Sequence, residues 1–222
     1  MPDPSDRTPT YFVQPDQYTL EMRLWDEGFS RIMGLDEVGR GCLAGPVVAA
    51  GVIMNPESRI PGIADSKKLN AKQRIAVAEE IKKSCLWWTV ASCDIQEIDR
   101  HNILGASLRA MEKCIQCTDP GPDYLLIDGN RGLSSMLIPS QTVIRGDDLS
   151  ATIGAASILA KVYRDNYMAI LHRQYPEYGW DKNVGYPTAF HYEALAKYGV
   201  TPHHRTSFRL RTNRPYQKGR SE

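Results

Sequence analysis

The sequence predicts an α/β fold built on a mixed β-sheet. Two apolar segments, residues 32–36 and 46–54, come first and are typical of the strands of a hairpin. Further on, short apolar strands alternate with helical segments, and the long segment 150–175 carries small residues suited to close packing on a sheet. A hairpin followed by strand, helix, strand and helix indicates a mixed sheet and excludes a repeat protein.

The predicted elements follow one another in a clear order. Strands are expected at residues 32–36, 46–54, 86–93, 124–128 and 142–145. Helices are expected at residues 70–84 and 150–175, and two more helical stretches lie between them, the second of which covers residues 103–116. The second strand is almost entirely Val, Ala and Ile, as expected where both faces of a sheet are covered. Asn70 is a candidate N-cap for the first helix. The segment CTDPGPD after residue 116 breaks the helical pattern.

The length of 222 residues favours one domain with terminal segments. Residues 1–30 carry several prolines and acids without periodicity, so we expect a mobile N-terminal arm there. The folded domain is expected over residues 31–208, and a basic tail over 209–222. The formal net charge is only +1, which gives no global basic field. From Arg205 onward, however, the sequence contains six basic residues and only one acid, Glu222.

The five cysteines are odd in number, and the polar start of the chain lacks the apolar stretch of a secretory signal. We therefore expect reduced thiols and a cytoplasmic protein. Cys114 and Cys117 could form half of a zinc site or a redox pair, but no second pair completes such a site, and two cysteines at a helix end are the simpler interpretation. No apolar run approaches the roughly 20 residues that span a membrane, so no membrane association is expected.

Acidic residues follow three of the predicted strands. They are Asp36 with Glu37, Asp128, and Asp147. Side chains at the carboxyl ends of neighbouring strands in an α/β sheet converge on one crevice. Clustered carboxylates repel one another unless cations lie among them, and hard divalent cations prefer such oxygen ligands. For any one acid, Asp128 before Gly129 for example, a turn-capping role is the alternative.

Asp36 and Glu37 are adjacent, and adjacent strand residues point to opposite faces. Both side chains therefore reach one metal only if the strand breaks at Gly39; otherwise one of the two residues binds through its backbone carbonyl. The Gly-Arg-Gly that follows could belong to a plain turn or to a dinucleotide-binding loop, but a β-rich segment with Pro46 comes next instead of a helix. Its glycines would also let a partner approach the backbone, with Arg40 near a phosphate.

The segments GLDEVGRGCLAGPVVAAGVI, DSKKL, LLIDGN, RGDDLSATIGAASILAKVYRD and GYPT resemble, in order and spacing, those of the type 2 ribonucleases H, the bacterial ribonuclease HII enzymes. The resemblance covers about residues 32–208. It implies a ribonuclease H-like mixed five-stranded sheet flanked by helices, with a C-terminal helical extension. It also implies divalent-metal hydrolysis of the RNA strand of RNA/DNA hybrids and of ribonucleotides embedded in duplex DNA.

The same resemblance implies the site residues. The family's metal-binding and catalytic carboxylates correspond to Asp36, Glu37, Asp128 and Asp147, its Gly-Arg-Gly to Gly39, Arg40 and Gly41, and its junction-sensing tyrosine to Tyr186. An enzyme selective for ribonucleotides must contact the 2′-hydroxyl, which backbone groups at the glycines and the Tyr186 hydroxyl can do. Phosphate contacts add affinity without sequence information, and Lys67, Lys68 and Arg40 are candidates.

Other polar residues have simpler interpretations. Ser157 and Lys161, four apart on one helix, lack the oxyanion loop of a serine-lysine nucleophile and are expected as a helix-face pair or a phosphate contact. Arg164 and Asp165 are expected to form a structural ion pair, with a peripheral role of Asp165 near the site as the alternative. His203 and His204 are expected at the surface or on the substrate side.

The predicted reaction uses the four acids to hold two magnesium or manganese ions, with activated water attacking the phosphorus in line and leaving a 3′-hydroxyl. The expected partner is an RNA/DNA hybrid or duplex DNA containing ribonucleotides, and the expected state is a monomer. Two rivals stay open at this point: a DNA nuclease of the same superfamily, which would cut an all-DNA duplex equally fast, and a hybrid-binding module without catalysis.

Overall fold

A five-stranded mixed sheet forms the centre of the computed structural model, which describes residues 17–63, 67, 69–133, 135–208 and 210. The strands are β1 (Ile32–Val38), β2 (Val47–Ile53), β3 (Trp87–Cys93), β4 (Tyr124–Asp128) and β5 (Ser140–Val143). They lie in the order β3-β2-β1-β4-β5, with β1–β2 and β2–β3 antiparallel and β1–β4 and β4–β5 parallel. The predicted mixed five-stranded sheet is confirmed.

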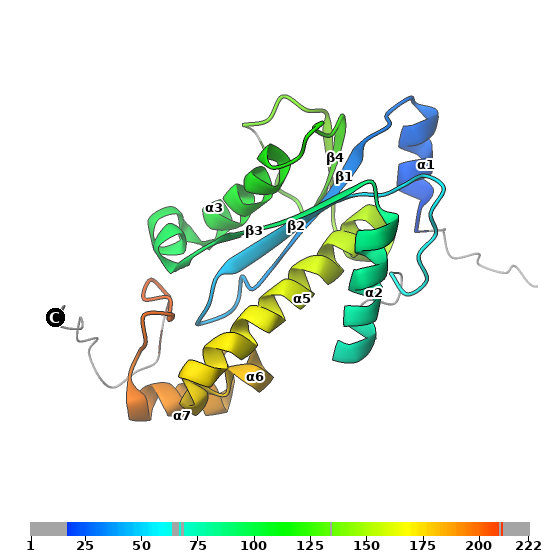
Figure 1. Cartoon of the computed structure of the whole chain (residues 1–222). Helices are drawn as coiled ribbons and strands as arrows, with labels where there is room; N and C mark the ends of the chain where they lie inside the picture. Colours follow the sequence, from blue (N-terminus) through cyan, green and yellow to red (C-terminus); the bar gives the residue numbers. More distant parts are fainter. Residues whose placement is uncertain (1–16, 64–66, 68, 134, 209, 211–222) are drawn as a thin grey trace, which may run out of the picture.

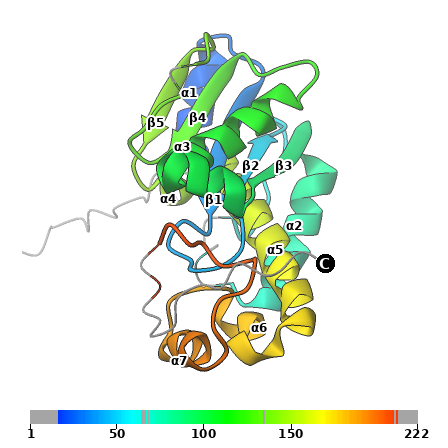
Figure 2. The same cartoon turned by 90° about the vertical axis from the view of Figure 1, so that its left-hand side faces the viewer.

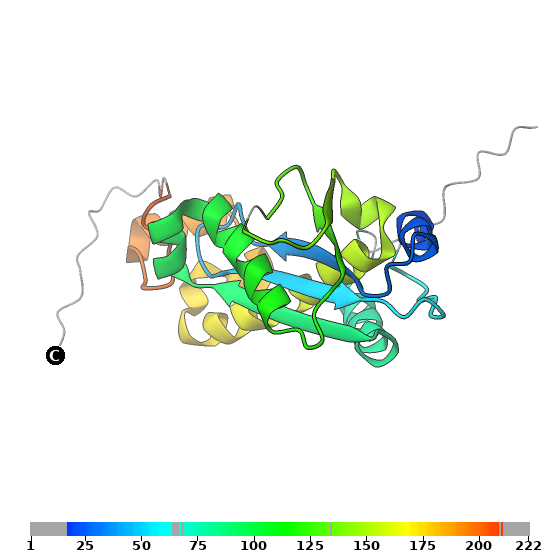
Figure 3. The same ribbon diagram turned by 90° about the horizontal axis from the view of Figure 1, so that it is seen from above.

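Helices cover both faces of this sheet. They are α1 (Thr19–Asp26), α2 (Ala71–Ser84), α3 (Ile95–Gln116), α4 (Gly146–Leu149), α5 (Ala151–Gln174), the short 3₁₀ helix η2 (Pro176–Tyr178), α6 (Trp180–Asn183) and α7 (Ala189–Tyr198). Helix α3 lies on one face, and α5 lies on the other with α2 beside it (Figure 1; Figure 3 gives the view from above). Helices α6 and α7 lie beyond the end of the sheet and form the predicted C-terminal helical extension (Figure 2).

Strand β2 is buried along its whole length because both of its faces are covered. Val48, Ala50 and Val52 pack in one core with α5, whereas the alternate residues Val47 and Ala49 pack in a second core with α3. This alternation extends to β1, so each residue of β1 can be assigned to the α3 face or the α5 face. Each fully buried aliphatic side chain contributes about 1.5–3 kcal/mol to folding.

Helix α5 packs directly against the backbone of β1. A Cβ atom on Gly34 would lie only 2.3 Å from the carbonyl carbon of Thr152 and 2.4 Å from the amide nitrogen of Ile153. Glycine is therefore required at this point of β1, and the first turns of α5 lie in contact with the strand that carries Asp36.

One predicted boundary is confirmed in the structure and another shifts. Helix α3 contains a kink at Asn102, which has a φ of 57° and accepts hydrogen bonds from the N–H groups of Leu104 and Gly105, so the predicted start of a second stretch at residue 103 is confirmed. Strand β5 covers residues 140–143 instead of 142–145, because Arg145 adopts a left-handed conformation with a φ of 58°. Asp147 consequently lies on α4 and not at a strand end.

The N-terminal arm predicted over residues 1–30 needs a correction. Residues 19–26 form α1, whose Leu24 is buried in a core cluster with Ile32 and Leu126. Tertiary contacts therefore hold this helix against the domain. Residues 1–16 of the predicted arm, Lys68 and nearly all of the predicted basic tail lie outside the described residues.

The cysteines are free thiols, with Cys114 buried inside α3 and Cys117 exposed at its C-cap, as expected for helix-end cysteines. None of the helices in the described part of the chain is long and apolar enough to cross a membrane.

Candidate nuclease active site

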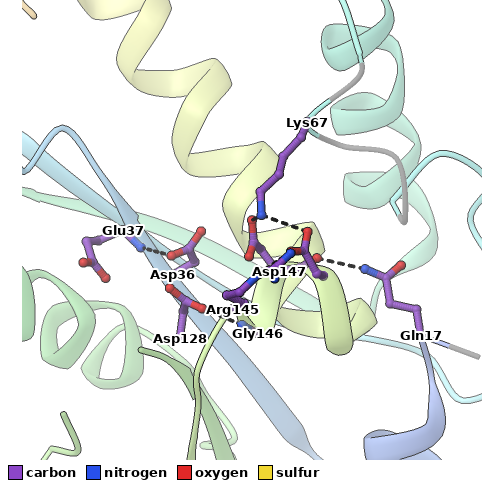
Figure 4. Close-up of polar contacts among 9 residues, drawn as sticks. Gln17, Asp36, Glu37, Lys67, Asp128, Arg145, Gly146 and Asp147 are labelled. Carbon is purple, nitrogen blue, oxygen red and sulfur yellow. Dashed lines mark hydrogen bonds and ion pairs between the residues drawn. The ribbon is translucent and has the colours of Figure 1, made fainter. Parts of the chain in front are cut away.

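Asp36 and Asp128 come together through the pairing of β1 with β4. The last pair of this parallel ladder is Leu35 with Ile127, so the two aspartates are the next residues on neighbouring strands. Leu35 and Ile127 pack in the core on the α3 face. Because side chains alternate along a strand, both aspartates point to the α5 face, where Figure 4 shows them close to Asp147.

Asp36 is the most enclosed of the candidate acids, with only 7% of its surface exposed. Burial holds the pKa of its carboxyl well above the usual range, and the negative charges of Asp128 and Glu37 raise the pKa further. A hydrogen bond with the Ser157 hydroxyl on α5 acts in the opposite direction. Asp36 is thus a carboxylate that is costly to ionise unless a positive charge lies beside it.

Asp128 connects β4 to the following helix. Its Oδ1 accepts a hydrogen bond of 2.7 Å from the backbone N–H of Gly146, the first residue of α4. Burial raises the pKa of Asp128, the Gly146 bond lowers it, and the charge of Asp147 raises it. Gly146 has no room for a side chain, because a Cβ atom there would lie 2.5 Å from Ile153.

Asp147 lies on α4 and is paired with a lysine. The Nζ atom of Lys67 is 2.8 Å from Oδ2 of Asp147 and 2.8 Å from Oδ1 of Asp148. These hydrogen bonds raise the pKa of Lys67 and lower that of Asp148, to which Arg145 also donates. A cation therefore already lies between two carboxylates at this edge of the site.

Glu37 points to the other face of the sheet. Its Oε1 is 2.9 Å from Nη1 of Arg40, and Figure 4 shows its carboxylate turned away from Asp36 and Asp128. Burial raises the pKa of Glu37, while Arg40 lowers it. Strand β1 stays regular through Val38, so the predicted opposition of the two adjacent acids is confirmed.

The backbone N–H of Glu37 contacts the neighbouring acid. It donates to Oδ1 of Asp36 over 2.8 Å. Glu37 lies beyond Leu35, the last residue of β1 that pairs with β4. In the described part of the chain, no group of three or more Asp, Glu, His or Cys side chains is arranged to hold a metal ion.

The Gly-Arg-Gly segment forms the start of a loop between β1 and β2. Gly39 has a φ of +93°, and a Cβ atom there would lie 2.2 Å from Nε of Arg164, so only glycine fits. Arg40 and Gly41 are exposed. A Cβ atom on Gly41 would come no nearer than 4.0 Å to the Tyr186 ring, which places the exposed loop backbone beside that tyrosine.

Two buried arginines fix the shape of this loop. Arg164 donates to the carbonyls of Pro46, Ala44 and Val184 over 2.8–3.0 Å. Arg205 donates to the carbonyls of Gly45 and Arg40 over 3.0 Å. Arg205 was not predicted as a site residue, because a basic residue ahead of a basic tail gives no sign in the sequence that it is buried.

The expected ion pair between Arg164 and Asp165 is wrong. Arg164 is fully buried and binds carbonyls, whereas Asp165 accepts from Nζ of Lys161 over 2.7 Å. Ser157 bonds to Asp36 and not to Lys161, so the two residues do not form a pair. Sequence reasoning noticed Ser157 but missed its contact with the buried acid.

Tyr186 lines one cleft together with two of the candidate acids. The cleft has a volume of about 350 Å³, and its lining includes Glu37, Lys67, Asp147 and Tyr186. The tyrosine is 39% exposed, and its hydroxyl interacts with the thiol of Cys42. The structure thus brings four of the predicted residues to one cleft, while Glu37 and Arg40 also line a second cleft with Asp128 on the α3 side.

His204 is not at the surface, which corrects the expectation for that residue. It is 1% exposed, and burial lowers its pKa to about 3. Its Nδ1 accepts from the N–H of Thr201, and its Nε2 bonds to Nε2 of His191 over 3.0 Å. His191 contacts the backbone carbonyl of Tyr186 through Nδ1, so this neutral pair supports the loop that carries the tyrosine.

Solved structures define the class of protein to which this fold belongs. Ribonuclease H2 from Pyrococcus horikoshii OT3 matches with a TM-score of 0.71 and 23% identity over 81% of this chain and 94% of that chain. The ribonuclease HII of the complex with PCNA from Archaeoglobus fulgidus matches with a TM-score of 0.71 and 26% identity over 82% and 95%. Bst-RNase HIII in complex with Mn²⁺ matches with a TM-score of 0.64 and 20% identity over 95% and 74%. The fold is that of the type 2 ribonucleases H.

The sequence comparisons are more specific. The profile of the family described as Ribonuclease HII matches residues 33–211. Ribonuclease HII of Salinibacter ruber (strain DSM 13855 / M31) is 51% identical over 193 residues, which cover 86% of this chain and 96% of that protein. Ribonuclease HII of Ruegeria sp. (strain TM1040) is 50% identical over 191 residues, covering 86% and 83%. The chain belongs to the ribonuclease HII family and is a metal-dependent endoribonuclease.

Proposed function

We propose that the chain hydrolyses the RNA strand of RNA/DNA hybrids and cuts on the 5′ side of ribonucleotides embedded in duplex DNA. The observation that carries the proposal is the cleft that Asp147, Lys67 and Tyr186 line together, near the neighbouring aspartates Asp36 and Asp128. One side of such a cleft can bind the scissile phosphate while the other tests the ribose. A cytoplasmic location and a monomeric state stay predictions.

The acidic side fits divalent cations. Asp36, Glu37 and Asp128 all have raised pKa values through burial, and Asp128 raises the pKa of both other acids. Cations relieve this repulsion, and carboxylate and carbonyl oxygens are the ligands that Mg²⁺ and Mn²⁺ prefer. We infer that Asp36, Asp128, Asp147 and Glu37 hold two such ions, with Glu37 contributing its backbone carbonyl.

When bound, the ions supply activation of the attacking water and neutralisation of charge on the phosphate and the leaving oxygen. The side chains of the protein position the ions and bind the substrate. Asp36 and Asp128 concentrate negative charge where the ions bind, and Asp147 must release Lys67 to join them. The freed Lys67 ammonium can then bind a substrate phosphate. In-line attack by water leaves a 3′-hydroxyl and a 5′-phosphate.

The glycines and Tyr186 recognise the ribonucleotide. Only a backbone without side chains can approach the minor-groove side of a ribose closely; Gly41 provides it at the exposed turn, while the buried Gly39 shapes the turn. The 2′-hydroxyl can donate and accept, so loop carbonyls and amides and the Tyr186 hydroxyl are suitable partners. The arginines beneath the loop hold these groups in place before substrate binds.

The test is a cleavage assay on three duplexes: an RNA/DNA hybrid, a DNA duplex with one ribonucleotide, and an all-DNA duplex. Each is incubated with Mg²⁺, with Mn²⁺ and with EDTA. We expect 5′-side cleavage of the first two substrates only, and only with a metal ion. Equal cleavage of the all-DNA duplex, or no cleavage of the duplex with one ribonucleotide, would contradict the proposal.

A variant assigns the chemistry to the site. Asp128→Asn should lower cleavage by at least about 100-fold while leaving hybrid binding in EDTA intact, because the phosphate contacts remain. Asp26→Asn, at the exposed end of α1, is the matched control and should cleave as the wild type does. Activity of Asp128→Asn within tenfold of the wild type would count against its role.

A further inference from the structure

The segment from Gln17 to Leu24 lies outside the proposed catalytic groups, yet it contacts the helices that carry two of them. Tyr18 is buried in the core shared with α5, and its hydroxyl accepts from the N–H of Ile60 over 3.3 Å. Leu24 is buried in a cluster with Ile153 of α5. The segment is thus fixed to the domain at both of its ends.

Gln17 makes two hydrogen bonds across the junction between α4 and α5. Its Nε2 donates to the backbone carbonyl of Asp147 over 2.9 Å (Figure 4), and its own carbonyl accepts from the N–H of Ala151 over 2.9 Å. A helix of four residues such as α4 has few internal bonds, so these external contacts matter for its position.

Glu21 holds the first turn of α5. It is fully buried, and its Oε1 accepts from the hydroxyl of Ser150, the hydroxyl of Thr152 over 2.7 Å and the N–H of Thr152 over 2.9 Å. A carboxylate at the N-terminus of a helix satisfies free N–H groups and interacts favourably with the helix dipole. Glu21 therefore acts as a cap for α5 that comes from another helix.

The hydrogen bond between Gln17 and the Asp147 carbonyl has space because residue 154 is a glycine. A Cβ atom on Gly154 would lie 3.1 Å from Nε2 of Gln17 and 3.1 Å from the carbonyl oxygen of Asp147, which is closer than ordinary contact. The absent side chain allows the glutamine amide and the α4 carbonyl to meet over the surface of α5.

The contacts continue to the acids themselves. Gln17 binds the backbone of Asp147, and the preceding residue of α4, Gly146, donates its N–H to Asp128. Helix α5, capped by Glu21, carries Ser157, which bonds to Asp36. The N-terminal segment therefore contacts Asp147 directly, and it is connected to Asp128 through Gly146 and to Asp36 through α5 and Ser157.

We propose that Gln17 and Glu21 are positioning residues of the active site, which hold α4 and the start of α5 so that Asp147 and Asp128 lie at the spacing that divalent-ion binding needs. The inference rests on the proposed role of these aspartates. It assigns a function to a part of the chain whose sequence carries no catalytic motif.

The experiment measures Mn²⁺ binding to the full-length protein by isothermal titration calorimetry without substrate, together with thermal unfolding in EDTA. Gln17→Ala removes the amide donor, and Gln17→Glu keeps the size of the side chain but places an acceptor against the Asp147 carbonyl. Arg23→Ala is the matched control, because this exposed α1 residue bonds only to Gln141 and Glu27 in the described structure. Asp147→Asn is the reference for loss of a ligand.

We expect both Gln17 variants to bind Mn²⁺ about 10-fold more weakly than the wild type, as found for residues that orient metal ligands. Arg23→Ala should bind as the wild type does, and all three should unfold at similar temperatures in EDTA. Mn²⁺ affinity of the Gln17 variants equal to that of Arg23→Ala would overturn the inference, even if their unfolding temperature were lower. Unchanged Mn²⁺ binding by Asp147→Asn would instead overturn the proposed metal site itself.

Discussion

The ammonium of Lys67 lies 2.8 Å from a carboxylate oxygen of Asp147, one of the acids proposed to bind metal. The lysine side chain is 59% exposed, so solvent screens this pair and its net contribution is small, about 1 kcal/mol or less. The pair is therefore weak enough to exchange when a divalent ion and a substrate phosphate arrive together.

Lys67→Met should separate the two roles of this lysine. Loss of the competing cation is expected to tighten Mn²⁺ binding by up to about five-fold, which corresponds to an exposed ion pair. Loss of a phosphate contact should raise the KM for a hybrid by roughly 10-fold. Calorimetry and steady-state cleavage measure the two effects, with Lys82→Met on α2 as the control. Weaker Mn²⁺ binding by Lys67→Met would show that the lysine supports the site instead of competing for it.

Asp36→Asn should stabilise the metal-free protein while abolishing cleavage. A carboxyl whose pKa is raised on folding holds its proton more tightly in the folded chain, so its contribution to stability is present below the unfolded pKa and is lost as the pH rises through the folded pKa. Ionisation of the buried Asp36 therefore becomes increasingly unfavourable to the folded chain as the pH rises. We expect the variant to gain on the order of 1–2 kcal/mol in its free energy of unfolding.

The measurement is urea unfolding in EDTA, followed by tryptophan fluorescence, at a series of pH values. The gain should shrink as the pH falls through the unfolded pKa of about 3.9, because the unfolded carboxyl then takes up a proton as well. Added Mn²⁺ should stabilise the wild type and not Asp36→Asn. A variant less stable than the wild type at pH 8 would refute this account of the buried acid.

Tyr186→Phe should reduce discrimination and spare general hydrolysis. The ring stays in place, but the hydroxyl that we propose for the 2′-oxygen is lost, which is worth about 1 kcal/mol, or roughly a five- to ten-fold change. We expect kcat/KM on a duplex with a single ribonucleotide to fall by this factor, with a smaller effect on a long hybrid. Tyr198→Phe on α7 is the control. An equal loss on both substrates would remove the specific role.

Arg164→Met should destabilise the protein strongly. The guanidinium is fully buried and satisfies three loop carbonyls, which the substitution leaves without donors. Unpaired buried groups of this kind cost about 1–3 kcal/mol each, so we expect a loss of at least about 3 kcal/mol in urea unfolding. Arg173→Met, exposed on the same helix, should change stability little. A similar stability of both variants would contradict the role of Arg164 in holding the loop.

Local patterns in the sequence were sufficient to predict the strands that carry Asp36 and Asp128, whereas β5 begins two residues earlier than expected and Asp147 lies on α4. The apolar runs before Asp36 and Asp128 are short and clearly bounded, and alternation correctly placed Glu37 on the opposite face. Helix α1 was missed because the prolines and acids of residues 1–16 suggested a mobile arm that extended over it, whereas contacts of Glu21 and Leu24 hold it against the domain. Such contacts cannot be recognised before the fold is known.

Two errors have simple geometric causes. Neighbouring residues on a helix point about 100° apart, so Arg164 and Asp165 do not face each other. Arg164 instead donates to backbone carbonyls, and Asp165 accepts from Lys161. In the His203-His204 pair, the sequence gives no indication of which imidazole points inward. The structure buries His204 and stacks the ring of His203 edge-on against Tyr175.

In the described residues, the hydrogen bonds of the two buried arginines go to backbone carbonyls of the Gly-Arg-Gly loop and its neighbours. The course of the loop is therefore largely independent of the side chains that it presents to solvent. Position 40 in particular can be substituted without removing any of these bonds, because Arg205 binds its carbonyl. A scaffold of this kind separates the shape of a recognition loop from its chemistry, and makes the outward residue a suitable starting point for redesigning substrate preference.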